Sequence, residues 1–198
     1  MKWSGIPALL LSICVLALPA YADIHDYYQR GIDARGEGRY SDAVMMFERL
    51  ADEGDPRAEH QLAMMYLQGE GVTPDPEMGV RLLEKSANKN HAAAQYDLGR
   101  LYLEGAHVEK DQETAVFLFG LAAENGSTDA QLLLADMFYK GDIVGRDYKQ
   151  AYIYLLIALQ SDKVFSPEWV DSIEARLSRE EMNSARYFVR RWLEKNRH

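Results

Sequence analysis

The chain has 198 residues, a formal net charge of −9 and a single cysteine, Cys14. The charge is uneven, because residues 23–162 hold 13 Lys or Arg against 25 Asp or Glu, whereas residues 163–198 hold 8 against 6. Binding to phosphate groups needs a basic face, so this composition argues against nucleic acid and anionic lipid as main partners.

Residues 1–22 have the pattern of a secretory signal peptide. Lys2 gives a positive start, residues 6–18 form an almost uninterrupted apolar run, and residues 20–22 read Ala-Tyr-Ala, which resembles a cleavage site. The run is shorter than the roughly 20 residues of a spanning helix, so cleavage after Ala22 is favoured over a membrane anchor. Cleavage would export the chain, to the periplasm or beyond, without stable membrane insertion. It would also remove the one cysteine, which excludes disulfides and thiolate sites.

A period of 36 residues runs through residues 23–162. Six series of residues carry it: Ala58, Ala94 and Ala130; Leu62, Leu98 and Leu134; Tyr66, Tyr102 and Phe138; Gly69, Gly105 and Gly141; Val72, Val108 and Val144; Asp75, Asp111 and Asp147. A fixed period of this length indicates stacked supersecondary units, and hence a solenoid that presents an extended surface.

Each repeat predicts two helices joined by a short loop. In the first complete unit, Asp55-Pro56 supplies a helix cap and a first-turn proline, and Gly69 ends that helix. Asp75-Pro76 starts the partner helix in the same way. The repeated Asp is therefore interpreted as a helix cap that contributes about 1 kcal/mol, not as a catalytic acid. Small residues let the helices approach closely at Gly79, Ala115 and Ala151, and again at Ala87 and Ala123.

The repeats have a different unit at each end. A shorter unit precedes them, in which residues 38–43 replace the longer loop while Ala43 and Ala51 stay in register. After residue 162 the period stops, and residues 163–198 predict a capping pair of helices that start at Ser166-Pro167 and at the capping box Ser178 to Glu181. The expected apolar face of the last helix is Met182, Ala185, Phe188, Val189 and Trp192. A dimerising or docking helix around Tyr187, Phe188 and Trp192 is the alternative.

The shorter unit, with Tyr27, Gly31 and Phe47, resembles the tetratricopeptide pattern. The later units resemble the Sel-one-like repeat family, through Ala94-x-x-x-Leu98-Gly99-x-x-Tyr102-x-x-Gly105-x-x-Val108-x-x-Asp111-x-x-x-Ala115. The resemblance implies an all-α solenoid of about four antiparallel helix pairs, and a role in the bacterial envelope as an adaptor between proteins. Two departures concern loop glycines: Asn90 stands where a later unit has Gly126, and Ala106 is paired with Gly71.

No catalytic, metal or cofactor site is predicted. Ser86 and Lys89 match the S-x-x-K motif of penicillin-interacting enzymes, but Ser86 falls at a packing position and the companion motifs are absent. His60 and His91 lie in no recognisable metal-ligand spacing.

The inner helices then carry the candidate binding surface. Positions between the packing residues are expected to face the concave side of the solenoid, where the mixture of aromatic, Met and Arg side chains is typical of binding hot spots. The predicted partner-binding residues are Tyr28, His60, Met64, Tyr96, Arg100 and Tyr139. The alternative is that this stripe only packs on neighbouring helices.

The sequence therefore predicts an exported, non-enzymatic module that binds another protein or peptide in the bacterial cell envelope. Two alternatives stay open: a secreted or surface protein that binds a host glycoprotein, and a β-lactam or cell-wall-interacting protein that uses Ser86.

Overall fold

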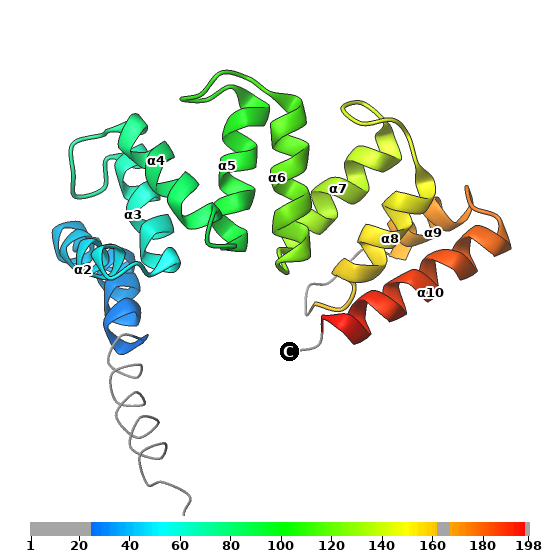
Figure 1. Ribbon diagram of the computed structural model, residues 1–198, viewed down its shortest axis with the longest axis horizontal. Coiled ribbons are helices and arrows are strands. Elements are labelled where there is room, and N and C mark those ends of the chain that lie inside the picture. Colours follow the sequence, from blue (N-terminus) through cyan, green and yellow to red (C-terminus); the bar gives the residue numbers. More distant parts are fainter. Residues whose placement is uncertain (1–24, 162–166, 197–198) are drawn as a thin grey trace, which may run out of the picture. The chain divides into compact units, whose positions relative to one another are not determined.

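The computed structural model describes residues 25–161 and 167–196, in which every regular element is a helix. A helix at residues 25–36 comes first. It is followed by α2 (Tyr40–Asp52), α3 (Pro56–Gln68), α4 (Pro76–Ala87), α5 (Ala92–Glu104), α6 (Gln112–Glu124), α7 (Thr128–Lys140), α8 (Tyr148–Ala158), α9 (Pro167–Glu174) and α10 (Arg179–Lys195) (Figure 1). The predicted all-α fold of consecutive helix pairs is confirmed. The predicted signal peptide, its cleavage site and Ser166 lie outside the described residues.

The chain forms two compact units that divide within α4. Unit 1 is Met1–Leu82 and unit 2 is Leu83–His198. In unit 1, α2 packs against α3; in unit 2, α5 packs against α6, α6 against α7, and α7 against α8. None of the helices in the described ranges is long and apolar enough to cross a membrane.

The same backbone hydrogen bond recurs every 36 residues in the loop between the helices of each pair. The backbone N–H of the repeated Asp donates to the carbonyl of an aromatic residue: Asp75 to Tyr66 at 3.0 Å, Asp111 to Tyr102 at 2.9 Å and Asp147 to Phe138 at 2.9 Å. The same Asp side chains accept backbone N–H groups in the first turn of the next helix. The predicted role of these residues as caps is confirmed, and each one also closes its loop.

Within residues 25–161 and 167–196, two residues other than glycine have a left-handed backbone, Asn90 with φ 62° and His107 with φ 64°. Gly126, with φ 90°, is the counterpart of Asn90, and Gly71, with φ 73°, is the counterpart of His107. The pairing of Ala106 with Gly71 was therefore wrong by one residue, because a spacing of 36 leads from Gly71 to His107.

Glycine at position 107 is expected to stabilise the protein, and glycine at position 106 to destabilise it. His107→Gly relieves a positive φ and should raise the free energy of unfolding by about 0.5–1 kcal/mol. Ala106→Gly only adds freedom to the unfolded chain and should lower it by a similar amount. Urea unfolding of the two variants checks the signs, and two changes in the same direction would contradict the assignment.

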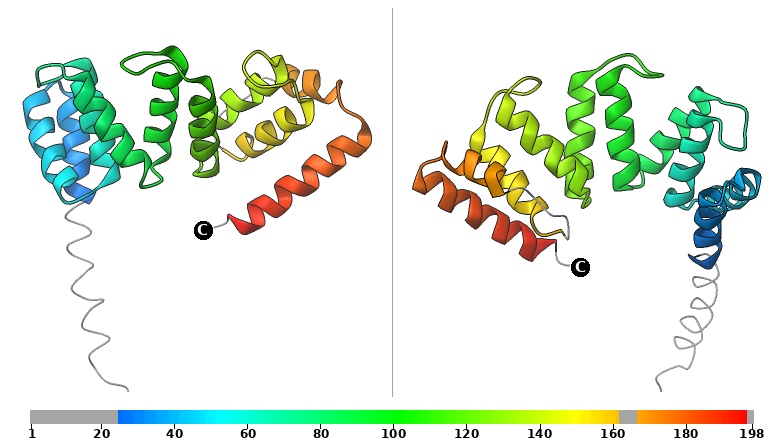
Figure 2. Two further views of the ribbon diagram at one scale, coloured as in Figure 1. Left: turned by 45° about the horizontal axis from the view of Figure 1, so that its top comes forward. Right: turned by 180° about the vertical axis from the view of Figure 1, so that it is seen from behind.

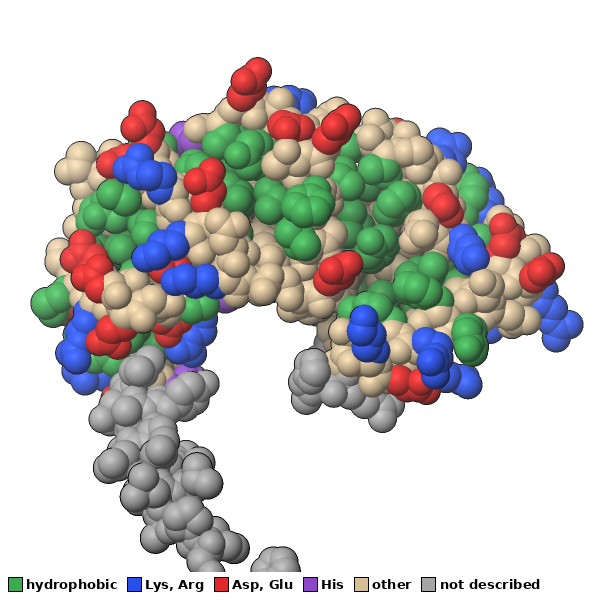
Figure 3. Space-filling model, viewed as in Figure 1, with side chains coloured by type: hydrophobic (Ala, Val, Ile, Leu, Met, Phe, Trp, Pro, Cys, Tyr) green, Lys and Arg blue, Asp and Glu red, His purple; other side chains and the backbone are tan. Residues whose placement is uncertain are grey.

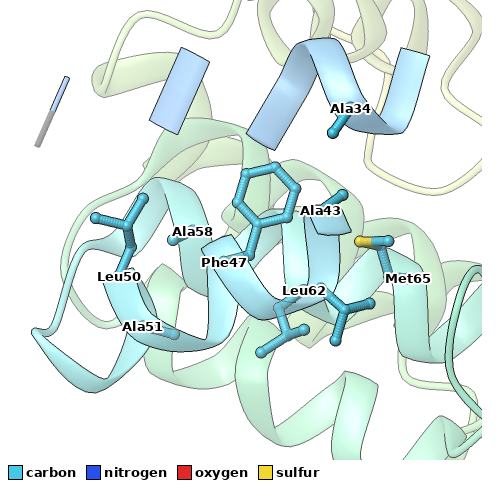
Figure 4. Packing of buried hydrophobic residues seen from close by; sticks show 9 residues of the cluster. Ala34, Ala43, Phe47, Leu50, Ala51, Ala58, Leu62 and Met65 are labelled. Carbon is cyan, nitrogen blue, oxygen red and sulfur yellow. The ribbon is translucent and has the colours of Figure 1, made fainter. Parts of the chain in front are cut away.

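The core of unit 1 lies between the helix at residues 25–36, α2 and α3 (Figure 4). The Phe47 ring is fully buried among Ala34, Ala43 and Met65. Gly31 is opposite this ring, and a Cβ at that position would stand 2.7 Å from it. Phe47 therefore needs a glycine on the facing helix.

The same relation returns in unit 2 with a change of size. A Cβ on Gly99 of α5 would meet the buried Phe119 ring of α6 at 2.8 Å. One repeat later, the corresponding residues are Ala135 and Leu155, which are both fully buried in one cluster. The larger Phe119 therefore faces glycine, and the smaller Leu155 corresponds to alanine on the facing helix.

The last two helices cover α8 (Figure 2). Ile173, Ala185 and Val189 are buried in the cluster that also contains Tyr152 of α8. The Tyr152 hydroxyl hydrogen-bonds to Glu174 of α9 and accepts from Arg186 of α10, so one side chain joins three helices. Burial, followed by the hydrogen bond with Glu174, raises the pKa of Tyr152.

The Ser178–Glu181 capping box is present as predicted. The predicted inward orientation of Phe188 was wrong, because half of this side chain is exposed while its neighbour Val189 is buried. The two residues are adjacent on a helix, so only one of them can face α8.

Candidate interaction surfaces

Tyr28 of unit 1 is held against its neighbours on two sides. Its ring lies 5.8 Å from that of Phe47, and the guanidinium of Arg57 lies 4.6 Å from its centre. Burial is the largest effect on the Tyr28 hydroxyl and raises its pKa, while a hydrogen bond with Gln61 acts in the opposite direction. Tyr28 is therefore half-buried, and one part of it remains available to a partner.

The other two predicted residues of unit 1 differ in accessibility. Met64 of α3 is half-buried, whereas only 8% of His60 is exposed. His60 thus offers little surface to a partner, although it follows the same sequence register as Tyr28.

Arg35 holds the first helix to the next repeat. Its guanidinium donates to Glu70 at 2.7 Å, to Gln61 at 2.7 Å and to Gln68 at 3.0 Å. The three partners accept hydrogen bonds from the planar guanidinium group. A guanidinium suits several simultaneous hydrogen bonds better than the ammonium group of a lysine would. Arg35 is accordingly interpreted as a structural contact between successive repeats within unit 1.

In unit 2, Tyr96 and Arg100 lie one turn apart on α5. The Tyr96 ring packs 5.7 Å from that of Phe119, and it stays half-buried. Arg100 is exposed and pairs with Glu104 at 2.8 Å on the same helix. An exposed pair of this kind contributes little to stability, so Arg100 can exchange Glu104 for a partner at small cost.

Tyr139 of α7 packs edge-on against Tyr148 of α8, with 5.6 Å between ring centres. It is half-buried, as Tyr96 is. The six predicted residues thus fall into two groups, with Tyr28, His60 and Met64 in unit 1 and Tyr96, Arg100 and Tyr139 in unit 2.

Two buried glutamines were not predicted. The side-chain amide of Gln95 donates to the carbonyl of Ala87 at 3.0 Å, and that of Gln131 donates to the carbonyl of Ala123 at 3.0 Å. Gln95 also accepts from Asn125 at 3.0 Å. The two glutamines are 36 residues apart, so the period itself was the signal that could have identified them.

Ser86, the residue considered for catalysis, lies on α4. The Ser86 side chain has 0% exposure, as do its counterparts Ala122 and Ala158. In the described ranges, no group of three or more His, Cys, Asp and Glu side chains could hold a metal ion.

Surface hollows of unit 2 away from α5 include the following two. One of about 480 Å³ lies beside Phe117 of α6, whose side chain is 65% exposed. A second, of about 400 Å³, lies between α8 and α10.

Asp55, beside Tyr28, is expected to make stability depend on pH. Burial acts to raise the pKa of its carboxyl, but the hydrogen bonds and charge of Arg57 outweigh burial and leave that pKa below its ordinary value. A lowered pKa stabilises the folded state above about pH 4, and this contribution is lost as the pH falls through the folded pKa.

Asp55→Asn keeps a capping side chain but removes the charge. At pH 7 it should cost about 0.5–1 kcal/mol, and this deficit relative to the native chain should shrink by pH 3. Urea unfolding at both pH values measures the deficit, and a constant deficit would contradict the ionic contribution.

The fold and the repeated loops define the chain as an α-solenoid of helix pairs. A model of the Sel1 repeat matches residues 56–91, 92–127 and 128–162. The matched repeats cover more than half of the chain, so the protein belongs to the Sel1 repeat family. The shorter unit before residue 56 lies outside the matched repeats.

The solved structures that are similar to this chain include two bacterial proteins. A Sel1 repeat protein from Oxalobacter formigenes is 24% identical with a TM-score of 0.63, and the match covers 68% of this chain and 56% of that protein. The protein c5321, described as a protective antigen present in uropathogenic Escherichia coli strains, is 30% identical with a TM-score of 0.66. That match covers 78% of this chain but 33% of c5321, so this chain spans only part of either relative. None of the curated proteins compared with the chain matches it.

Proposed function

We propose that this protein is an exported, non-enzymatic adaptor of the bacterial cell envelope that binds another protein or a peptide. The observation that carries the proposal is the set of three Sel1 repeats, because Sel1-repeat proteins are generally modules for interaction between proteins. The signal-like pattern of residues 1–22 supports export, and the bacterial source of both structural relatives supports the assignment to bacteria.

The proposed contacts are the predicted residues with accessible surface. Arg100 exposes about half of its side chain, and Tyr28, Met64, Tyr96 and Tyr139 are each half-buried. Tyr and Arg are the residue types most often found at binding hot spots. Their rings and stems are already packed on one side, so little further ordering is needed when a partner binds.

A β-lactam-binding role for Ser86 has less support. A nucleophile must reach its substrate, and the Ser86 side chain has no exposed surface. We expect no increase in intact mass after incubation with a labelled β-lactam; an increase that Ser86→Ala removes would establish the alternative.

A secreted or cell-surface location is the second candidate. It is favoured by one observation, the description of the 30% identical relative from Escherichia coli as a protective antigen. In that case the partner would be a host glycoprotein. Protease treatment of intact cells separates the two locations, because a surface protein is digested and a periplasmic one is protected.

Photocrosslinking in living cells tests the proposed surface. Benzoylphenylalanine replaces Arg100 in one variant and Phe117 in the other, which places the same reactive group on α5 or on α6. Both positions are exposed, so neither replacement should disturb the fold. Irradiation is expected to give a discrete crosslinked species at position 100 that is absent at position 117.

The two positions also separate the function from its location on the chain. A discrete species formed only at position 117 would support an adaptor but contradict the proposed surface on α5. No discrete species at either position, in cells that produce the protein at its natural level, would contradict the adaptor role.

A further inference from the structure

The groove between α8 and α10 is a second surface with the composition of a docking site. The two helices run in the same direction along the end of unit 2 (Figure 1). The lining consists of Leu156 from α8 and Gln160 just after it, and of Arg186, Val189, Arg190, Leu193 and Glu194 from α10. This hollow of about 400 Å³ is named the α8–α10 groove.

The groove has an apolar floor. Val189 is buried at its base, while Leu156 and Leu193 are partly exposed. Tyr187 lies three residues before Arg190 and therefore on the same side of α10, where it exposes 67% of its surface. Apolar side chains of a partner could therefore pack against several apolar side chains on this side of α10.

The charges around the floor favour an acidic partner. Arg186 is already engaged by Glu174, at 2.9 Å, and by Tyr152. Glu194 also lines the groove, one turn after Arg190, but its carboxylate is paired with Arg191 at 3.5 Å. Among the residues that the structure describes, Arg190 has no ion pair, and it is exposed at the groove.

The whole helix shares this bias. The cations of α10 are Arg179, Arg186, Arg190, Arg191 and Lys195, against the acids Glu180, Glu181 and Glu194. In the space-filling view, basic and hydrophobic side chains lie next to one another along this helix (Figure 3). The repeats before it carry an excess of acidic residues, so α10 differs from the rest of the chain in sign.

We propose that the α8–α10 groove docks an acidic amphipathic helix of a partner protein. Two neighbouring helices with apolar residues between them receive the apolar face of a third helix, with anchors spaced by one turn. Carboxylates at the edge of that helix then pair with Arg190, whereas a neutral or basic helix would leave this cation without a counter-charge. The site lies on α8 and α10, so it can fail without affecting the proposal for α5.

Fluorescence anisotropy with a designed peptide tests the groove. The probe is a fluorescein-labelled peptide of 16 residues with Leu at helical spacing and Glu at most other positions. A second peptide has Gln in place of every Glu. The purified protein is expected to bind the acidic peptide and to bind the Gln peptide at least about tenfold more weakly, because only the carboxylates pair with the groove.

Charge reversal at neighbouring positions gives a matched pair of variants. Arg190→Glu is expected to weaken binding of the acidic peptide by about tenfold. Arg191→Glu makes the same change of charge on the same helix but outside the groove, and should weaken it by less than about threefold. Thermal melts followed by circular dichroism check that both variants are folded. Tyr187→Ala should also weaken binding of the acidic peptide, because it removes an exposed aromatic side chain beside the groove.

Four results would overturn the proposal, and the last of them is absence of binding. The first is equal loss of affinity in the two charge-reversal variants, and the second is equal affinity for the acidic and Gln peptides. The third is dimerisation at micromolar concentration that Arg190→Glu abolishes, which would make a second copy of this acidic chain the occupant. Absence of binding up to millimolar peptide also counts against it.

Discussion

Replacing Ala185 with arginine is expected to lower the free energy of unfolding by more than about 3 kcal/mol. Ala185 has no exposed surface, and it lies on the side of α10 that packs against α8. An arginine at this position has to bury its charge among apolar groups such as Tyr152 and Ile173, or push α10 away from α8. Either outcome removes the packing that covers the last repeat.

The exposed neighbour supplies the control. Ser184→Arg adds the same side chain one residue earlier, where it can extend into water, and should change stability by less than about 0.5 kcal/mol. Urea unfolding followed by circular dichroism measures both variants. Equal stability of the two would show that α10 does not serve as a cap, and that residues 163–198 need another explanation.

Gly99→Ala is expected to destabilise the protein by about 1–3 kcal/mol, although alanine favours helices over glycine by about 1 kcal/mol. The new methyl group would stand 2.8 Å from the Phe119 ring and 3.3 Å from the Ala115 carbonyl oxygen. The ring is fully buried, so α5 and α6 have to separate or the ring has to leave its preferred rotamer.

Phe119→Leu is expected to rescue the alanine variant. Alone it should cost about 1–2 kcal/mol, because it leaves a cavity beside Gly99. Combined with Gly99→Ala it recreates the Ala135 and Leu155 pair of the next repeat, so the two changes should cost at least about 1 kcal/mol less together than the sum of each alone. A double-mutant cycle measured by urea unfolding gives this coupling, and additive effects would contradict it.

Most of the fold could be predicted from the sequence because its signals are local and repeated. The caps at Asp111 and Asp147, the glycines that end α5 and α7, and the box at Ser178 depend on neighbouring residues of the chain. Because the period is 36 residues, an interpretation made in one repeat applies to the corresponding residues of the next repeat. The sequence interpretation paired Gly71 with Ala106, whereas the exact spacing of 36 leads to His107, which has the positive φ. The spacing therefore has to be applied exactly when residues of two repeats are paired.

The surface could not be predicted to the same depth, because accessibility depends on the neighbouring helix. Position 28 and position 60 share a register, yet Tyr28 keeps part of its surface exposed and His60 does not. Phe188 fits an apolar pattern but turns into solvent, since Val189 already fills the contact with α8. The groove beside Arg190 arises from the placement of α10, which lies beyond the repeats and follows no period.

The buried side-chain amides of Gln95 and Gln131 form the same hydrogen bond between successive repeats. Each one bonds to a carbonyl near the end of the preceding repeat, Ala87 for Gln95 and Ala123 for Gln131. A second copy of residues 92–127, inserted after residue 127, would meet Ala123 through its own copy of Gln95 and would offer its own copy of Ala123 to Gln131. Both hydrogen bonds already exist in the molecule. Duplication of a whole 36-residue repeat would therefore lengthen the protein without requiring a new kind of contact between repeats.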